Sequence, residues 1–194
     1  MKKLGIVFVV ALLAGFGVRF GWENLNQSEI NSPDIGVLQT ANGTLNLFDG
    51  NDPRTRIVYF GYTHCPDVCP TSLAILSAAL KKIPETELDN FWPVFISLDP
   101  ARDDGNQSDT YAGYFHPTMS GASGTEEQTA ALAKKYGVLY QISKLEDSEL
   151  EYAVDHSSYF YFLNPQGELV EKVPHTLNPD LVVAAIKRTL SQKQ

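Results

Sequence analysis

The sequence predicts a single α/β domain with a mixed β-sheet, and three observations lead to this prediction. Two apolar runs rich in β-branched and aromatic residues, 56–62 and 91–98, stand on either side of a helical pattern over 71–82. A strand, helix, strand order predicts two parallel strands joined by a right-handed crossover. Further along, two alternating segments flank the turn residues 164–167 and predict an antiparallel hairpin. With 194 residues, 43% of them hydrophobic, the chain can bury one substantial core.

The first half of the domain is predicted from strand and helix signals. The run 56–62 is typical of a buried central strand, because β-branched and aromatic side chains fill it. The helix over 71–82 has apolar residues at helical spacing, and Pro84 marks its end. Pro93 has no backbone N–H, so we expect the strand over 91–98 to have an irregular or edge beginning.

The second half is predicted to be helical and then to return to strands. Residues 109–115 are expected to form a short helix, and a capping box opens a second helix over 125–136. The strands 157–163 and 168–173 form the hairpin, and an Asn-Pro pair begins a last helix over 178–190. The order strand, helix, strand, helix, hairpin, helix is the thioredoxin-like arrangement.

The N-terminal residues predict one transmembrane helix that anchors the domain. Two lysines precede an uncharged apolar run over 4–18, which Arg19 and aromatic residues close. The run is shorter than the usual span of about 20 residues, so a cleaved signal segment is the alternative. We expect the anchor or signal segment over 1–22, a polar tether over 23–33 and the thioredoxin-like domain over 34–194. The lysines predict a cytoplasmic N-terminus, hence a single-pass inner membrane protein with its domain on the periplasmic side.

The charge distribution excludes one class of partner and favours another. The net charge is -8, and the first 22 residues carry three basic residues and no acid, so the remainder carries -11. Such an acidic body repels nucleic acid. Metal cations and proteins with basic docking surfaces are the expected partners.

The only two cysteines lie four residues apart where the first strand gives way to the first helix. At a helix N-terminus the thiolates of Cys65 and Cys69 are favoured by unpaired N–H groups and by the helix dipole. Thiolate is the form that binds metals or attacks disulfides. An inert structural disulfide is the alternative in an exported domain, but a bridge that closes so few residues stabilises little.

A third donor is expected, because copper and zinc sites usually use three or four ligands. His156 precedes the aromatic strand 157–163, and if that strand is antiparallel to 56–62, it begins beside the cysteines. We therefore predict that His156 completes the site. His64 is expected to point away from its neighbour Cys65 and to lie around the metal rather than bind it. The remaining two histidines, His116 and His175, are predicted to be solvated loop residues without partners.

Three motifs in order resemble those of the Sco family, also called SenC or PrrC, which are copper proteins of cytochrome c oxidase assembly. The first is Gly-Tyr-Thr-His-Cys-Pro-Asp-Val-Cys-Pro over 61–70, the second Ser-Leu-Asp-Pro-Ala-Arg-Asp over 97–103, and the third Val-Asp-His-Ser over 154–157. Residues 124–128 and 136–138 are also similar to the family's intervening segment. The resemblance covers roughly residues 34–190.

The resemblance implies one copper ion per chain, Cu(I) or Cu(II), held by Cys65, Cys69 and His156. It implies cytochrome c oxidase subunit II as the partner whose binuclear copper centre is assembled, with a thiol-disulfide reductant or another copper chaperone as further partners. Asp99 and Asp155 match family positions and are expected to support the metal or a docking surface. Asp67, between the cysteines, is a further supporting candidate, as is His64.

Three functions use the same side chains, so they stay open at the level of sequence. A metallochaperone binds copper without turnover, and three protein ligands leave an approach for the acceptor. A membrane-tethered thiol-disulfide oxidoreductase would be an enzyme that cycles the two cysteines, reducing the oxidase subunit or sensing redox state, although the spacing exceeds C-x-x-C by one residue. A zinc site with an open position is the third function, without a clearly placed general base.

Overall fold

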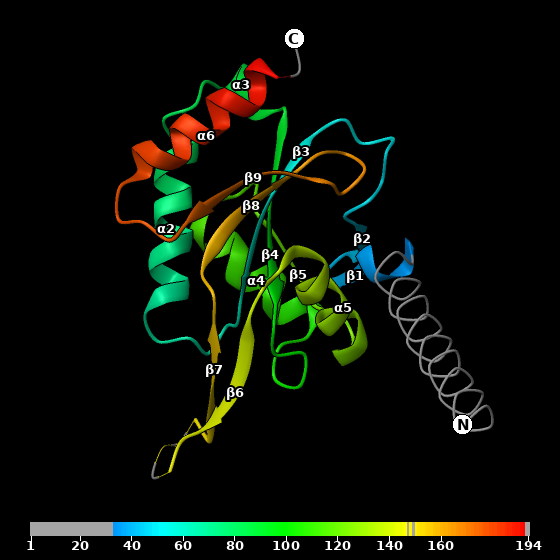
Figure 1. Ribbon diagram of the computed structural model, residues 1–194, viewed down its shortest axis with the longest axis vertical. Coiled ribbons are helices and arrows are strands. Elements are labelled where there is room, and N and C mark those ends of the chain that lie inside the picture. The colour runs from blue at the N-terminus through cyan, green and yellow to red at the C-terminus, as the bar shows by residue number, and fades with distance from the viewer. Residues whose placement is uncertain (1–32, 147, 149, 193–194) are drawn as a thin grey trace, which may run out of the picture. The chain divides into compact units, whose positions relative to one another are not determined.

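The computed structural model describes residues 33–146, 148 and 150–192 (Figure 1). The predicted membrane anchor, and all of the predicted tether except Pro33, lie outside these residues. Within the described part of the chain, none of the helices has both the length and the apolar composition that a membrane span requires.

The central sheet is mixed, as predicted, with five strands in the order β5-β4-β3-β8-β9. Strands β3, β4 and β5 are parallel, whereas β8 is antiparallel to β3 and β9 to β8. Their bounds are Thr55–Gly61 for β3, Phe91–Ser97 for β4, Ser120–Ala122 for β5, Tyr159–Leu163 for β8 and Leu169–Pro174 for β9. The prediction of an irregular or edge beginning at Pro93 is confirmed, because the first three residues of β4 pair only with β3. Pro93 is accommodated where the neighbouring β5, which pairs from Val94 onward, has not yet begun.

Helices cover both faces of this sheet, because successive strand residues point to opposite sides. On one face Phe95 packs against Tyr111 of helix α4, with ring centroids 5.2 Å apart. On the other face Phe60 packs against Tyr136 of helix α5 at 6.1 Å. Helix α2 contacts both α4 and α6 (Figure 1). The helix bounds are Val68–Leu80 for α2, Glu85–Leu88 for α3, Gly105–Phe115 for α4, Glu126–Tyr136 for α5 and Pro179–Ser191 for α6, and a 3₁₀ turn, η1, spans Pro33–Gly36.

Two helices begin earlier than the sequence predicted. Helix α2 starts at Val68 rather than at residue 71, because Pro70 lies in the first turn, where backbone N–H groups have no intrahelical partner. Helix α4 starts at Gly105 rather than at residue 109, because Asp104 and Gln107 form a capping box. The predicted starts of α5 and α6 are confirmed by a capping box and by an Asn cap followed by proline.

Two hairpins were not predicted. The first pairs β1, Val37–Thr40, with β2, Gly43–Asn46, and the second pairs β6, Tyr140–Lys144, with β7, Tyr152–His156. The β6–β7 hairpin projects from the end of the five-stranded sheet (Figure 1). Neither hairpin has one fully buried face, so the alternation of apolar residues that marks a strand is weak in both. His156 is the last residue of β7, and the strand that was predicted to start at residue 157 starts at Tyr159.

Candidate metal centre

The two cysteines meet at the N-terminus of α2. The Cys65 sulfur accepts a hydrogen bond from the backbone N–H of Cys69, at 3.4 Å, and another from the backbone N–H of Asp67. Cys69 is fully buried, whereas Cys65 is partly exposed. Both are free thiols in this structure. The loop therefore presents Cys65 to the outside and Cys69 to the interior.

His156 reaches the same point from the end of β7. Its Nε2 lies 3.3 Å from the sulfur of Cys69, and its ring also hydrogen-bonds with the side chain of Cys65. Its Nδ1 lies 3.2 Å from the carbonyl oxygen of Ser157. A carbonyl only accepts hydrogen bonds, so Nδ1 carries a proton, and Nε2 is the nitrogen that faces the thiols.

Aromatic rings fix the orientation of that imidazole. Tyr59 and Tyr62 lie edge-on to the His156 ring, with centroids 6.2 and 6.3 Å away. The hydroxyl of Tyr62 also hydrogen-bonds with the thiol of Cys65. Neither tyrosine was predicted to belong to the site, although Tyr62 is part of the first motif and Tyr59 of the strand before it.

Gly61 provides the space for the buried thiol. A Cβ atom at this position would lie 2.9 Å from the sulfur of Cys69, closer than real side chains approach one another. A larger residue at position 61 would therefore displace Cys69 or the rings of Tyr59 and Phe95 beside it.

The hydrogen bond between the thiols separates their acidities. It stabilises the Cys65 thiolate and, with help from His156 and two backbone N–H groups, lowers the pKa of Cys65 to about 3 against the opposing effect of burial. The same bond, together with burial, raises the pKa of Cys69. The pair therefore shares a single proton at neutral pH, with the thiolate on the more exposed sulfur.

The three donors contact one another directly rather than surround a common point. Among the described residues, no group of three or more His, Cys, Asp or Glu side chains is arranged so that it could hold a metal ion as it stands. Their chemistry nevertheless fits a soft cation, because two sulfurs and an imidazole are preferred ligands of Cu(I) and of zinc. Binding of a metal has to displace the proton of Cys69 and open its contact with His156. The contacts that close the centre are therefore the ones that a metal would replace.

The side chains of the other predicted polar residues have different surroundings. Asp155 is exposed and accepts a hydrogen bond from the hydroxyl of Ser143 at 2.5 Å. Asp67 is exposed at the N-cap of α2, and its backbone N–H rather than its carboxylate contacts Cys65. The Nδ1 of His64 lies 3.4 Å from the carboxylate of Asp103.

Asp99 is buried and contacts Tyr152, the first residue of β7. Its carboxylate accepts hydrogen bonds from the Nε of Arg102 at 2.5 Å and from the hydroxyl of Tyr152 at 2.7 Å. Asp103, which the sequence did not single out, is also fully buried and lies next to the cysteine loop. The second motif therefore supplies two buried carboxylates beside the centre.

The predictions for the two remaining histidines are wrong. His116 is buried, and its Nδ1 lies 2.9 Å from the hydroxyl of Thr118. The Nδ1 of His175 lies 2.7 Å from the hydroxyl of Ser72 in α2. Both rings are held by hydroxyl groups that their sequence neighbourhoods could not indicate.

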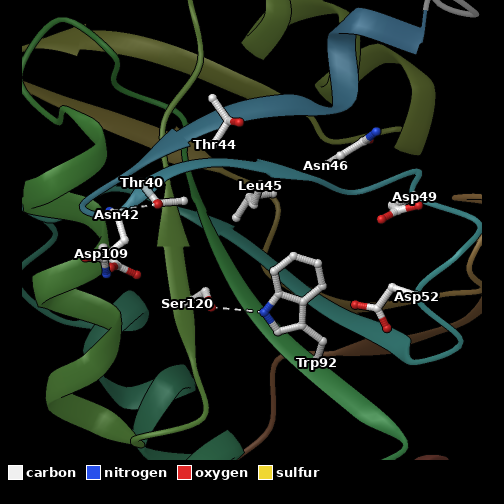
Figure 2. Close-up of a pocket in the computed structure, with 10 residues that line it drawn as sticks. All are labelled: Thr40, Asn42, Thr44, Leu45, Asn46, Asp49, Asp52, Trp92, Asp109 and Ser120. Atoms are coloured by element: carbon white, nitrogen blue, oxygen red, sulfur yellow. Dashed lines mark hydrogen bonds between the residues drawn. The ribbon is translucent and has the colours of Figure 1, made fainter.

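A separate pocket of about 390 Å³ lies at the opposite end of β4 from the thiols. Figure 2 shows the ring of Trp92 near its centre, with Nε1 donating to the hydroxyl of Ser120 at 2.9 Å. The residues that line it are mostly hydroxyl, amide and carboxylate side chains, and the three donors are not among them. A metal centre made of touching side chains leaves no cavity of this size, so the pocket and the centre are different places.

A thioredoxin-like domain with two thiols at one helix start and a histidine on a separate hairpin defines a class of proteins that bind soft metals or exchange disulfides. Within that class, residues 40–191 match the family model SCO1/SenC. The chain therefore belongs to the SCO1/SenC, or Sco, family.

Relatives in several organisms show the same relationship. Protein SCO1 homolog 1, mitochondrial, of Arabidopsis thaliana is 44% identical over 118 residues, which are 61% of this chain and 35% of that protein. Protein SCO2 homolog, mitochondrial, of Mus musculus is 37% identical over 70% of this chain and 53% of that protein. The chain thus spans a third to a half of the length of these curated relatives. The SCO2-like protein of Rickettsia felis is 28% identical over 94% of this chain and 95% of its own length.

Solved structures confirm the predicted thioredoxin-like fold. The crystal structure of Arabidopsis thaliana ScoI with copper bound has a TM-score of 0.71 and 35% identity, and the match covers 80% of this chain and 96% of that one. The solution structure of apo Sco1 from Thermus thermophilus has a TM-score of 0.69 and 34% identity, over 79% and 88%.

Proposed function

We propose that this protein is a copper-binding metallochaperone, with one copper ion as its cargo held by Cys65, Cys69 and His156. The observation that carries the proposal is the meeting of an imidazole nitrogen and a buried thiol at 3.3 Å across 87 residues of chain, beside a second thiol. The copper bound to the related Arabidopsis protein supports the identity of the metal.

The electrostatics of the pair suggest an order of events. Cys65 is the accessible thiolate and offers the first ligand, and the proton of Cys69 leaves as the second sulfur binds. His156 then supplies a nitrogen that suits Cu(I) and also tolerates Cu(II). Three protein ligands leave one side open, which lets an incoming thiolate or imidazole of an acceptor take over the ion.

The acceptor that we propose is the binuclear copper centre of cytochrome c oxidase subunit II. The support comes from the family, since one solved relative is described as a cytochrome c oxidase assembly protein. The charge of -11 outside the first 22 residues suits an acceptor with a basic docking surface. Copper transfer of this kind requires the domain on the periplasmic side of the inner membrane, held by the predicted anchor, where a reductant of the cysteines or another chaperone would load it.

The proposal is tested by titrating the reduced full-length protein in detergent with Cu(I) in the presence of a chromophoric chelator. We expect one copper per chain, and we expect His156→Ala to weaken binding by more than about tenfold, since loss of a ligand costs at least as much as loss of its supporting contacts. The matched control is His116→Gln, which removes a histidine that bonds Thr118 rather than any of the three donors and should leave the affinity unchanged. Equal affinities of the His156→Ala variant and the unaltered protein would contradict the proposal.

A second function, thiol-disulfide reduction, is favoured by the lowered pKa of Cys65, because an accessible thiolate attacks disulfides. It predicts catalytic turnover of a model disulfide by the copper-free protein with a regenerating thiol. Turnover that is lost in Cys65→Ser would support this function. Zinc is distinguished in the chelator experiment by competition, in which Cu(I) should displace it.

A further inference from the structure

One short segment contacts both halves of the candidate metal centre. Residues 97–103, here called the bracing segment, join the end of β4 to the N-cap region of α4. The cysteines lie about thirty residues before it and His156 about fifty residues after it. Side chains of this segment nevertheless bind the loop that carries Cys65 and the strand that carries His156.

The cysteine half is attached through Asp103. Its fully buried carboxylate accepts hydrogen bonds from the backbone N–H of Thr63 at 2.8 Å and from the Thr63 hydroxyl at 2.5 Å. The hydroxyl of Ser97 donates to the same carboxylate at 2.6 Å. Thr63 is two residues before Cys65, so Asp103 determines where the cysteine loop leaves β3.

The histidine half is attached through Arg102. Its Nη1 donates to the carbonyl oxygens of Leu150 and Tyr152, at 2.9 and 3.1 Å, and its guanidinium lies 3.5 Å from the centroid of the Tyr152 ring. The carboxylate of Asp99 binds both Arg102 and the Tyr152 hydroxyl, which closes the cluster. Tyr152 is the first residue of β7, and His156 is its last.

This attachment matters because β7 has little other support from strand pairing. In the described part of the chain, β7 pairs only with β6, and their two-stranded sheet is separate from the five-stranded one. A two-stranded hairpin is marginally stable by itself. Contacts from the bracing segment therefore supply the tie that β-pairing does not.

We propose that the bracing segment sets the separation of the metal donors, with Asp103 as a positioning residue for Cys65 and Arg102, oriented by Asp99, as a positioning residue for His156. The proposal rests on the proposed copper site, whose three donors must stand close together in the resting protein and still separate by a small distance when the metal enters. Attachment of both halves to the same seven-residue segment permits that small movement and prevents a large one.

A double-mutant cycle on Cu(I) affinity tests this arrangement in the full-length protein. Arg102→Gln should weaken binding by about tenfold when His156 is present, as loss of an outer contact does at other metal sites. In the His156→Ala background the same change should have no effect, because Arg102 acts through that histidine. Asp103→Asn should weaken binding in both backgrounds by the same factor, because it acts through Cys65. Equal losses for Arg102→Gln with and without His156 would overturn the proposal.

A surface pair of the same type gives the control. Arg54 binds Asp52 and lies 4.8 Å over the ring of Trp92, which repeats the Arg, Asp and aromatic combination at the other end of the sheet. Arg54→Gln should leave the copper affinity unchanged, and a tenfold loss there would show that the effect of Arg102 is general. If Arg102→Gln does not fold, Tyr152→Phe removes only the hydrogen bond to Asp99 and should show a smaller loss with the same dependence on His156.

Hydrogen exchange of the copper-free protein separates the positioning role from the proposed function. Arg102→Gln should speed exchange of the amides of β7 and leave the first turn of α2 unchanged. Asp103→Asn should speed exchange at Thr63, whose N–H loses its acceptor, and leave β7 unchanged. A protein that binds no copper but shows these two patterns would refute the proposed function alone, whereas exchange that rises equally in both regions in both variants would refute the bracing segment.

Discussion

The pH dependence of Cys65 alkylation tests the electrostatics of the centre directly. The structure lowers the pKa of Cys65 from 9.0 to about 3. At pH 6 an ordinary thiol with a pKa of 9 is about 0.1% thiolate, whereas Cys65 is almost wholly thiolate, a difference of about a thousandfold in reactive form. A weakly basic thiolate is also a weaker nucleophile, and a Brønsted coefficient of 0.4 to 0.5 over six units removes roughly 250- to 1000-fold. The two effects nearly cancel in the absolute rate at pH 6.

The slope against pH is therefore the informative quantity. We expect the rate of Cys65 modification by iodoacetamide, located by mass spectrometry, to be flat between pH 5 and 8, where an ordinary thiol changes about tenfold per unit. Because the hydrogen bond from Cys69 is the largest cause of the shift, Cys69→Ala should raise the pKa of Cys65 and restore a slope. Cys69→Ser keeps a hydroxyl donor and should keep the profile flatter. A tenfold rise per pH unit in the unaltered protein would refute the assigned sharing of the proton.

Three further predictions concern stability. Gly61→Ala should lower the free energy of unfolding by about 1–3 kcal/mol, measured with denaturant, because the new Cβ crowds Cys69 and the rings beside it. As the control, Gly113→Ala, in an open helical position, should raise the free energy of unfolding by about 0.5–1 kcal/mol. Equal losses in the two variants would contradict this prediction. Asn178→Ala should cost about 1 kcal/mol, because its side chain caps α6 through the N–H of Asp180, and an unchanged melting temperature would argue against that cap. The lowered pKa of Cys65 stabilises the folded state fully above pH 9, and this contribution is lost as the pH falls toward 3. Acidification should therefore lower the free energy of unfolding of the unaltered protein more than that of Cys65→Ser. Parallel plots of unfolding free energy against pH for the two proteins would contradict this prediction.

Much of the fold was predictable because its signals are local. The buried run 56–62 corresponds to β3 within one residue at each end, and the caps at Thr125 and Asn178 mark helix starts in the structure. Elements without a buried face were missed, above all the β6–β7 hairpin, whose strands show no clean apolar alternation. Pro93 was a local signal that held, because a residue without a backbone N–H lies in the part of β4 that β5 does not reach.

The sequence correctly predicted that the three candidate donors lie close together, and their role as copper ligands stays a prediction. An argument from strand direction placed His156 beside Cys65 and Cys69, and the structure brings all three into contact. Asp155 was expected from its match to a family position, and its exposed carboxylate binds Ser143 because adjacent strand residues point to opposite sides. Asp103 could not be recognised in advance, since its partner Thr63 lies forty residues away.

The sequence by itself determined the class of fold, the identity of the soft donors and the acidic character of the domain. These properties follow from residue types and short spacings, which persist however the chain is folded. The tertiary structure alone decided which thiol holds the proton, which nitrogen of His156 faces the sulfurs and which buried carboxylates hold the two halves together. Those outcomes depend on burial and on hydrogen bonds between distant residues, and both exist only once the strands and helices have packed.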